Sequence, residues 1–260
     1  MAPDTLSLAG KVAIVTGSGR ENGIGAAIAL ALARNGASVT INHVSDSVAT
    51  RAAGVAKKVE EVGGKATVVQ ANISTPEGAA KLINATLEAF KTDKIDILVN
   101  NAAAGMATPL LKETKEGIDT LMGTALYGPI FMIQQVVPKM PRGGRIINIG
   151  SISSKLGTPA SPLYAAGKAS LDTLSFAVSM QLGREFGITI NTVMPGPVKT
   201  ECLPPHIQEA IHGHLVPMTR AEERAGRAED IADAVLLLTS ELSRWVTGQT
   251  ISVSGGITGN

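Results

Sequence analysis

The sequence is poor in cysteine, in aromatic residues and in net charge. Cys202 is the single cysteine among 260 residues, so no disulfide can form within the chain and an oxidising compartment is not indicated. Lysine and arginine together number 23 against 22 aspartates and glutamates, so the chain lacks the net positive field that collects nucleic acid or anionic membrane surfaces. Any site for an anion must therefore be local.

Long hydrophobic runs are also missing. The segment Met1–Lys11 lacks the basic stretch and apolar run of a secretory signal, and no stretch approaches the roughly 20 apolar residues that span a bilayer. We therefore expect a cytoplasmic protein with neither a membrane nor a nucleic acid as its partner.

What the sequence does contain is a regular alternation of short apolar runs with amphipathic stretches. The expected strands are Val12–Thr16, Ser38–Asn42, Ala66–Gln70, Ile95–Asn100, Arg145–Gly150, Thr189–Met194 and Thr250–Val253. The expected helices are Gly25–Asn35, Ser47–Gly63, Pro76–Phe90, Gly117–Pro138, Ser161–Phe186 and Glu229–Ser240. This order predicts an α/β fold with a doubly wound, seven-stranded parallel sheet that carries helices on both faces. No linker-like segment divides the chain, so residues 1–260 are expected to form one domain.

One long segment, Glu201–Ala228, shows no regular pattern and carries Pro204, Pro205 and Pro217 with three of the four histidines. A connection of this length inside a compact domain is usually a lid or a binding loop. We assign it to the substrate, together with Ala104–Leu111, and expect it to move when ligand binds.

A glycine-rich segment, Thr16–Gly25, follows the first strand and opens the first helix. Glycines allow the backbone to approach a pyrophosphate, and a helix N-terminus offers free N–H groups. An ordinary glycine-rich turn is the alternative interpretation. The stretch from Gly17 to Gly23 is also longer than the common dinucleotide-binding pattern.

The end of the second strand bears on the choice of cofactor. An aspartate or glutamate there would bind the ribose diol of NAD, but the sequence reads Asn42, His43, Val44, Ser45. Arg20 in the preceding turn is suited to a 2′-phosphate. We therefore expect NADP(H), with Asp46 close enough to keep NAD as the alternative.

Tyr164 and Lys168 stand four residues apart on one expected helical face, and Ser151 follows the fifth strand directly. A tyrosine can protonate a carbonyl oxygen, but its ordinary pKa of about 10 calls for a neighbouring cation that lowers it. Lys168 is the expected cation, and Ser151 is expected to hydrogen-bond the carbonyl oxygen. On spacing alone, such a pair is usually a solvated helix face, and only the surrounding motifs favour the catalytic interpretation.

Taken in order, the motifs resemble those of the short-chain dehydrogenase/reductase family along essentially the whole chain. They are Thr16–Gly25, Asn100-Asn101-Ala102, Ser151, Tyr164-xxx-Lys168, and Pro195-Gly196 with Thr200. The resemblance implies a Rossmann-like fold and a homo-oligomer, a dimer or tetramer. It also implies that Asn100 and Ala102 line the cofactor, and that Val198 and Thr200 contact its carboxamide. Trp245 is expected, from its residue type, to pack at a subunit contact rather than to act as a catalytic group.

The expected catalytic residues are Ser151, Tyr164 and Lys168. The residues expected to bind NADP(H) are Gly17, Ser18, Arg20, Gly23, Ile24, Asn42, His43, Asn72, Ile73, Asn100, Ala102, Tyr164, Lys168, Pro195, Gly196, Val198 and Thr200. No metal is expected, because the spacing of Cys202, His206, His212 and His214 matches no common zinc pattern.

The family pattern is broken at Ala125, where relatives usually have a catalytic asparagine. Asn72 likewise stands where the family often has an aspartate near the adenine. The function expected from the resemblance is NADPH-dependent reduction of a ketone, or the reverse oxidation of a secondary alcohol, on a small apolar or polycyclic substrate. A non-redox cyclase or dehydratase that keeps its cofactor, and an NADP-binding regulatory protein, remain as alternatives because of Ala125.

Overall fold

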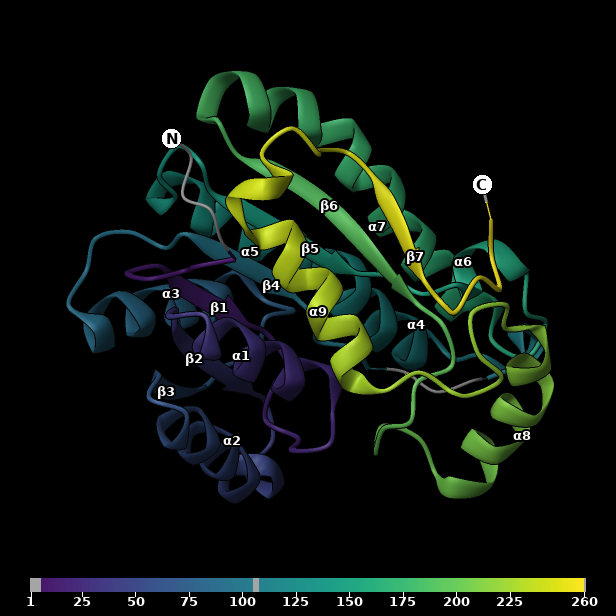
Figure 1. The fold of residues 1–260 in the computed structure, drawn as a ribbon. Coiled ribbons are helices and arrows are strands. Elements are labelled where there is room, and N and C mark those ends of the chain that lie inside the picture. The colour runs from purple at the N-terminus through teal and green to yellow at the C-terminus, as the bar shows by residue number, and fades with distance from the viewer. Residues whose placement is uncertain (1–5, 105–107, 260) are drawn as a thin grey trace.

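The computed structural model describes residues 6–104 and 108–259 and contains a seven-stranded, fully parallel sheet (Figure 1). The strand order is β3-β2-β1-β4-β5-β6-β7. The strands are β1 Val12–Val15, β2 Ser38–His43, β3 Lys65–Gln70, β4 Ile97–Asn100, β5 Arg145–Ile149, β6 Thr189–Pro195 and β7 Thr250–Val253. The predicted doubly wound sheet is thereby confirmed.

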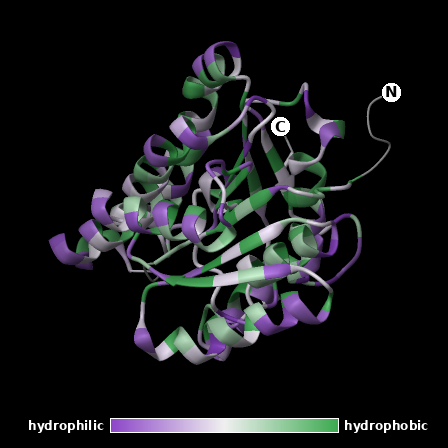
Figure 2. Ribbon diagram, turned by 90° about the vertical axis from the view of Figure 1, so that its left-hand side faces the viewer, coloured by the Kyte–Doolittle hydropathy of each residue, from purple (hydrophilic) through white to green (hydrophobic). Residues whose placement is uncertain are grey.

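Helices cover both faces of this sheet (Figure 1). They are α1 Ile24–Arg34, α2 Ala49–Glu61, α3 Pro76–Phe90, α4 Lys115–Met122, α5 Gly128–Val136, α6 Ser153–Leu156, α7 Pro162–Gln181, α8 Pro205–Leu215 and α9 Ala228–Thr239. Helices α1, α2 and α9 pack on one face, and α3, α5 and α7 pack on the other. Green, apolar strands fill the interior in Figure 2, whereas purple segments lie on the outer helices.

The alternation of side chains along β1 shows how the sheet builds two cores. Ala13 and Val15 join the cluster beneath α1 and α9, while Val12 and Ile14 join the cluster beneath α3 and α5. Successive residues of a strand point to opposite faces, so a strand covered on both sides reads as a continuous apolar run. Full burial of each large apolar side chain contributes about 1.5–3 kcal/mol.

The strand order reverses between β1 and β4, which are neighbours in the sheet although β2 and β3 lie between them in sequence. On its other side, β1 pairs with β2. Val15 pairs with Val99, so the carboxyl ends of β1 and β4 emerge side by side. Ligands of doubly wound sheets bind at this switch point. The glycine-rich turn after β1 and the Asn100–Ala102 segment after β4 are thus brought together.

The predicted helix Gly117–Pro138 is interrupted. Between α4 and α5 the chain forms a π-helical turn over Gly123–Tyr127, and a 3₁₀ turn over Val137–Lys139 follows α5. Inserted π turns are frequent at functional sites, and this one contains Ala125.

The expectation that Glu201–Ala228 is irregular throughout is wrong. It contains α8, followed by a 3₁₀ turn at Val216–Met218. Pro204 precedes the helix and Pro205 occupies its first turn, where the missing N–H costs nothing. The prolines that suggested a loop therefore mark a helix start. Part of the other expected substrate segment, residues 105–107, lies outside the described residues.

The junction between the two turns generates a stability prediction. Gly17 has φ of +62°, and a Cβ added there would lie 2.7 Å from Ala102 Cα. We expect Gly17→Ala to destabilise the protein by at least about 2 kcal/mol in urea unfolding, because the substitution combines left-handed backbone strain with overpacking. Gly213→Ala in α8 is the matched control, since no atom lies within 4 Å of its added Cβ. Equal stability of the two variants would contradict this account of the junction.

Candidate active site

The glycine-rich turn is shaped by two buried polar side chains. Asn42 Oδ1 accepts a hydrogen bond from the Gly17 N–H at 3.1 Å. Ser18 Oγ donates to the Val15 carbonyl at 2.7 Å and accepts from the Asn42 N–H at 3.1 Å. Ser18 is fully buried and Asn42 is 2% exposed. Both were predicted to bind cofactor, and the structure shows their side chains fixing the backbone that would do so.

Asn42 also fastens the neighbouring strand ends. Its Nδ2 lies 3.2 Å from the Val69 carbonyl and 3.1 Å from the Ala71 carbonyl. His43 is buried, with Nδ1 3.1 Å from the Ser45 carbonyl oxygen. The nearest acidic side chain along the chain, Asp46, accepts a hydrogen bond from Gln70 Nε2 at 2.7 Å. The carboxylate that could have favoured NAD is thus already engaged.

Helix α1 begins at Ile24 without a side-chain cap and without an acidic residue in its first turn. The first N–H groups of a helix have no partner within it, and the dipole makes this end positive. Gly23 occupies the N-cap position, so no side chain blocks the approach. The predicted pyrophosphate position at Gly23 and Ile24 therefore has the chemistry that an anion requires.

A basic cluster lies beside this helix end. Arg51 in α2 and Asn22 both hydrogen-bond the Glu201 carboxylate, which the chain presents just after Thr200. The hydrogen bond from Arg51 is the largest cause that lowers the pKa of Glu201, and the charge of Arg20 adds to it. Sequence reasoning identified Arg20 but missed Arg51. The sequence feature that could have identified Arg51 is its position, as a cation, in the first turn of the helix that follows β2.

The turn after β4 is joined to the turn after β1 by Asn101, which was not among the predicted site residues. Asn101 Nδ2 donates to the carbonyls of Thr16 and Gly17 at 2.8 and 3.1 Å. The N–H groups of Asn101 and Ala102 each lie 3.0 Å from Thr16 Oγ1. The signal that could have identified Asn101 was its place in the Asn100-Asn101-Ala102 motif.

The side chains of Asn100 and Ile73 face inward. Asn100 Nδ2 donates to Asn148 Oδ1 at 2.8 Å, and Asn100 is 3% exposed. Ile73 is 4% exposed and belongs to the core under α3 and α5. Asn72 Oδ1 accepts from the N–H and the hydroxyl of Ser74, at 3.1 and 2.7 Å. Contacts of these three residues with a cofactor remain predictions.

The three predicted catalytic residues converge beyond the end of β5. Pro162 is the first residue of α7, so Tyr164 projects from the first turn of this helix. Ser161 occupies the N-cap position, and its side chain makes no capping hydrogen bond. Tyr164 shares a side-chain hydrogen bond with Ser151. Lys168 Nζ lies 5.8 Å from the centre of the Tyr164 ring and donates to the Ile149 carbonyl at 2.7 Å.

The electrostatics of the pair differ from the expectation. Burial raises the pKa of Tyr164 above its ordinary value, and the hydrogen bond from Ser151 is what lowers it. Lys168 does not contribute to the shift in the pKa of Tyr164. Burial also lowers the pKa of Lys168 to about 8. Tyr164 therefore carries its proton at neutral pH. The lowered pKa of Lys168 means that its charged form is less stable than in a solvent-exposed lysine.

The turn after β6 lies on the far side of the site. A Cβ added to Gly196 would lie 2.7 Å from Ser254 Cα, so this turn packs tightly on the end of β7. Val198 forms a β-bridge with Gly226, and the Thr200 carbonyl accepts from Gln208 Nε2 at 2.7 Å. These contacts hold the predicted carboxamide-binding segment against α8 and the approach to α9.

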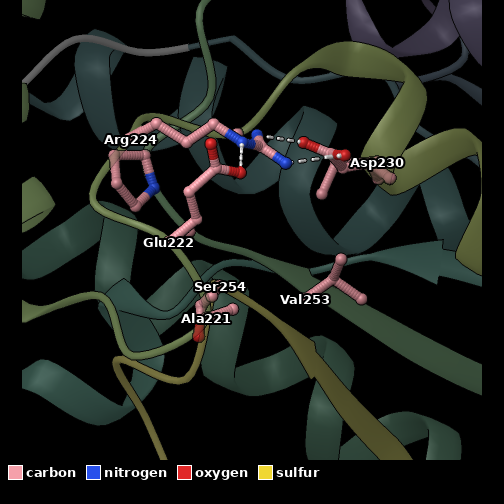
Figure 3. A pocket seen from close by; sticks show the side chains of 11 residues that line it. Ala221, Glu222, Arg224, Asp230, Val253 and Ser254 are labelled. Atoms are coloured by element: carbon pink, nitrogen blue, oxygen red, sulfur yellow. Dashed lines mark hydrogen bonds and ion pairs between the residues drawn. The ribbon is translucent and has the colours of Figure 1, made fainter.

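A pocket of about 600 Å³, open to solvent, lies behind this turn (Figure 3). Arg224 lies between the carboxylates of Glu222 and Asp230, with hydrogen bonds of 2.7 and 2.6 Å. None of Ser151, Tyr164 and Lys168 lines this pocket. Arg224 is paired with both carboxylates, and Asp230 lies in the first turn of α9. These ion pairs therefore stabilise the start of α9 and do not belong to the reacting centre.

In residues 6–104 and 108–259 no three histidine, cysteine, aspartate or glutamate side chains are grouped to hold a metal ion. Over the same residues, no helix combines the length and apolar character required to cross a membrane.

Comparison with known proteins extends over nearly the whole chain. Residues 17–258 match the family described as enoyl-(acyl carrier protein) reductase. The short-chain dehydrogenase/reductase FrzI of Cladobotryum sp. is 38% identical over 96% of this chain and 97% of its own length.

Two solved structures share the fold. A dehydrogenase/reductase from Sinorhizobium meliloti 1021 is 35% identical with a TM-score of 0.88, covering 98% of this chain and 97% of that one. The angucycline C-6 ketoreductase LanV with bound NADP is 33% identical with a TM-score of 0.88, covering 96% of each chain. Sequence, fold and site geometry agree, and the chain belongs to the short-chain dehydrogenase/reductase family as an NAD(P)-dependent oxidoreductase.

Proposed function

We propose that this protein reduces a ketone to a secondary alcohol with NADPH, or catalyses the reverse oxidation of the alcohol with NADP. The observation that carries the proposal is the convergence of Ser151, Tyr164 and Lys168 at the end of β5. A similar protein, LanV, is described as a ketoreductase and binds NADP.

The residues present fit the cofactor that the family implies. The uncapped start of α1 suits a pyrophosphate, and the close approach of Gly17 to Ala102 leaves a backbone surface that any larger side chain would fill. Arg20 and Arg51 would hold the 2′-phosphate. Lys168 would hold the ribose next to the nicotinamide, which supplies the hydride when bound.

The proton is the contribution of this chain's own residues. Tyr164 carries a proton at neutral pH and donates it to the carbonyl oxygen as negative charge develops there. Ser151 hydrogen-bonds the same oxygen, which stabilises that charge. Lys168 adds a positive charge within reach of the tyrosine ring, so the phenolate left after transfer is stabilised.

The substrate in this proposal is a small apolar or polycyclic ketone. Leu110 and Leu111, at the end of the predicted substrate segment Ala104–Leu111, are 60% and 99% exposed, and Met218 after α8 is 44% exposed. Met194 is 3% exposed and packs in the core. Helix α8 and Leu110–Lys112 would cover such a substrate from two sides, with α8 as the moving part of the lid.

Ala125 supports a second candidate, a non-redox cyclase or dehydratase that retains its cofactor. Ala125 is 4% exposed and has no side-chain group with which to hold a relay water. The intact Ser151, Tyr164 and Lys168 favour the reductase. NADPH consumption during turnover separates the two, because a cyclase or dehydratase would leave the cofactor unchanged.

We further propose a homo-oligomer, a dimer or tetramer, assembled around the edge of the sheet at β7. Phe176 and Met180 of α7 are 70% and 63% exposed, and Trp245 before β7 is 96% exposed. Phe176 borders the β7 approach, because a Cβ added to Gly248 would lie 3.3 Å from its ring. An exposed edge strand flanked by apolar side chains is normally covered by a partner.

The assembly is tested by light scattering coupled to size-exclusion chromatography. We expect wild type to elute as a dimer or tetramer, and Phe176→Glu and Trp245→Glu each to reduce the mass, because a buried charge at the contact costs several kcal/mol. Leu111→Glu introduces the same charge at a 99% exposed site in the turn Leu110–Lys112 between β4 and α4, outside the proposed contact, and should not change the mass. A monomeric wild-type protein would refute the assembly.

Cofactor choice is tested by titration with NADPH and NADH. We expect tighter binding of NADPH, and Arg20→Ala should weaken NADPH by about 10- to 100-fold, because a charge-assisted hydrogen bond contributes about 1.5–3 kcal/mol. NADH binding should stay within about twofold of wild type. Arg34→Ala, at an exposed position at the other end of α1, serves as the control. Equal affinity of the wild type for both cofactors would exclude the assignment.

The acid is tested by Tyr164→Phe. We expect carbonyl reduction to fall by about 10²–10⁴-fold, the usual effect of losing a positioned acid, with NADPH affinity nearly unchanged. Lys168→Ala should impair both turnover and NADPH binding. Stopped-flow NADPH oxidation and fluorescence titration measure the two quantities. Full activity of Tyr164→Phe would show that another group supplies the proton.

A further inference from the structure

The inward face of α7 carries polar residues at intervals of four. Tyr164, Lys168 and Asp172 follow one another down this face, and each contacts the chain that leaves β5. Residues four apart lie one above the other on a helix. The predicted acid and cation are thus continued by a third ionisable group, which neither the proton transfer nor the cofactor site described above uses.

Asp172 is connected to the serine loop, residues 151–154, through Ser154. Ser154 Oγ lies 3.0 Å from Asp172 Oδ2 and 2.9 Å from the Ser151 carbonyl oxygen. Ser154 Oγ also lies 3.4 Å from Met194 Sδ. The Ser154 hydroxyl shares its single proton between the Asp172 carboxylate and the Ser151 carbonyl, and so links Asp172 to the segment that presents Ser151 to Tyr164.

The surroundings of Asp172 are largely dry. The side chain is 10% exposed, and its Oδ1 has no hydrogen-bond partner among the residues that the structure describes. A Cβ added to Gly150 would lie 3.4 Å from that oxygen, so Gly150 leaves room for it. The charged groups that face the carboxylate are Lys168 on its own helix and Lys155 of α6, whose Nζ lies 4.0 Å from Oδ2 and is half exposed. Strand β6 contributes Met194 near Ser154 and no charge.

Lys168 and Asp172 stabilise each other's charges. Burial lowers the pKa of Lys168 to about 8, and Asp172 is the group that raises it. Burial also raises the pKa of Asp172, which Ser154 lowers most, followed by Lys155 and Lys168. A buried ammonium without a compensating charge becomes neutral instead of remaining charged. Lys168 has one further partner here, the neutral carbonyl of Ile149.

We propose that Asp172 is a positioning residue that fixes the serine loop through Ser154 and keeps Lys168 in its ammonium form. This role rests on the proposed reductase function of the same site. Asp172 touches neither substrate nor cofactor; it acts through Ser151 on the geometry of the carbonyl and through Lys168 on the charge beside Tyr164.

The charge is tested by the titration of Lys168, followed through its ¹³Cε resonance in protein labelled at lysine. The resonance is assigned by its loss in Lys168→Arg. A lysine is charged below its pKa, so we expect Asp172→Asn to move the midpoint down by about 1 pH unit. Asp172→Glu, which keeps the negative charge, should restore most of the midpoint. An unmoved midpoint in Asp172→Asn would overturn the proposal.

The loop is tested with Ser154→Ala, which removes the bridge and keeps the carboxylate. We expect amide hydrogen exchange over residues 151–155 to rise at least about fivefold, while the Lys168 midpoint moves by less than half of the Asp172→Asn shift. Unchanged exchange would overturn the positioning of the loop, and it would do so even if Asp172→Asn failed to fold. Asp233→Asn, an exposed aspartate on α9, is the control and should change neither quantity.

These readouts need no turnover, so they separate the two proposals. In an active reductase the alkaline loss of activity should move to lower pH in Asp172→Asn, following the Lys168 midpoint. A shifted midpoint in a protein that oxidises no NADPH with any ketone would refute the reductase and leave the role of Asp172 intact. An active reductase with unshifted midpoint and activity profile would refute the role of Asp172.

Discussion

The contact between α7 and the chain leaving β5 is the interaction on which the site depends. The donation from Lys168 Nζ to the Ile149 carbonyl occurs between a buried ammonium and the last residue of the strand. Because both partners are held by regular structure, the direction in which Ser151 leaves the sheet is fixed relative to Tyr164. Any displacement of α7 relative to β5 would therefore change the distance between Tyr164 and Ser151.

A second polar chain supports the same contact from inside the protein. Asn148 Nδ2 donates to Ser175 Oγ at 2.9 Å, and Ser175 Oγ lies 2.9 Å from Thr192 Oγ1. Asn100 joins the other side of Asn148, so the chain runs from β4 through β5 and α7 to β6. Groups buried in this way cost free energy unless they are paired, and pairing demands one arrangement of the four elements. The network thus gives the helix a defined register against the sheet.

Much of this architecture could be predicted from the sequence. The strand–helix alternation is a local signal, and it correctly predicted the parallel sheet, α1, α3 and α9, although Ile95–Asn100 was shortened to Ile97–Asn100. The spacing of Tyr164 and Lys168 placed both side chains on one face of α7. In each case the information lies within a few neighbouring residues.

The features that were missed depend on contacts between distant parts of the chain. Asn101 and Arg51 acquire their roles only when β1, β4 and α2 meet, and neither residue type is distinctive in its own segment. Helix α8 was obscured by the prolines that begin it. The pKa of Tyr164 was assigned to the nearest cation along the helix, whereas burial and Ser151 determine it, and burial cannot be read from spacing.

The alanine at position 125 makes physical sense in this packing. A Cβ added to Gly167 would lie 3.0 Å from Ala125 Cβ and 2.9 Å from Leu121 Cδ2, so two small residues allow the π-helical turn to lie against α7. Gly167 directly precedes Lys168, so this contact lies on the helical turn that carries the cation. A buried amide at position 125 would require partners of its own, as every buried polar group does. Ala125 therefore leaves room for α7 at the residue that precedes Lys168, and its side chain can make no hydrogen bond there.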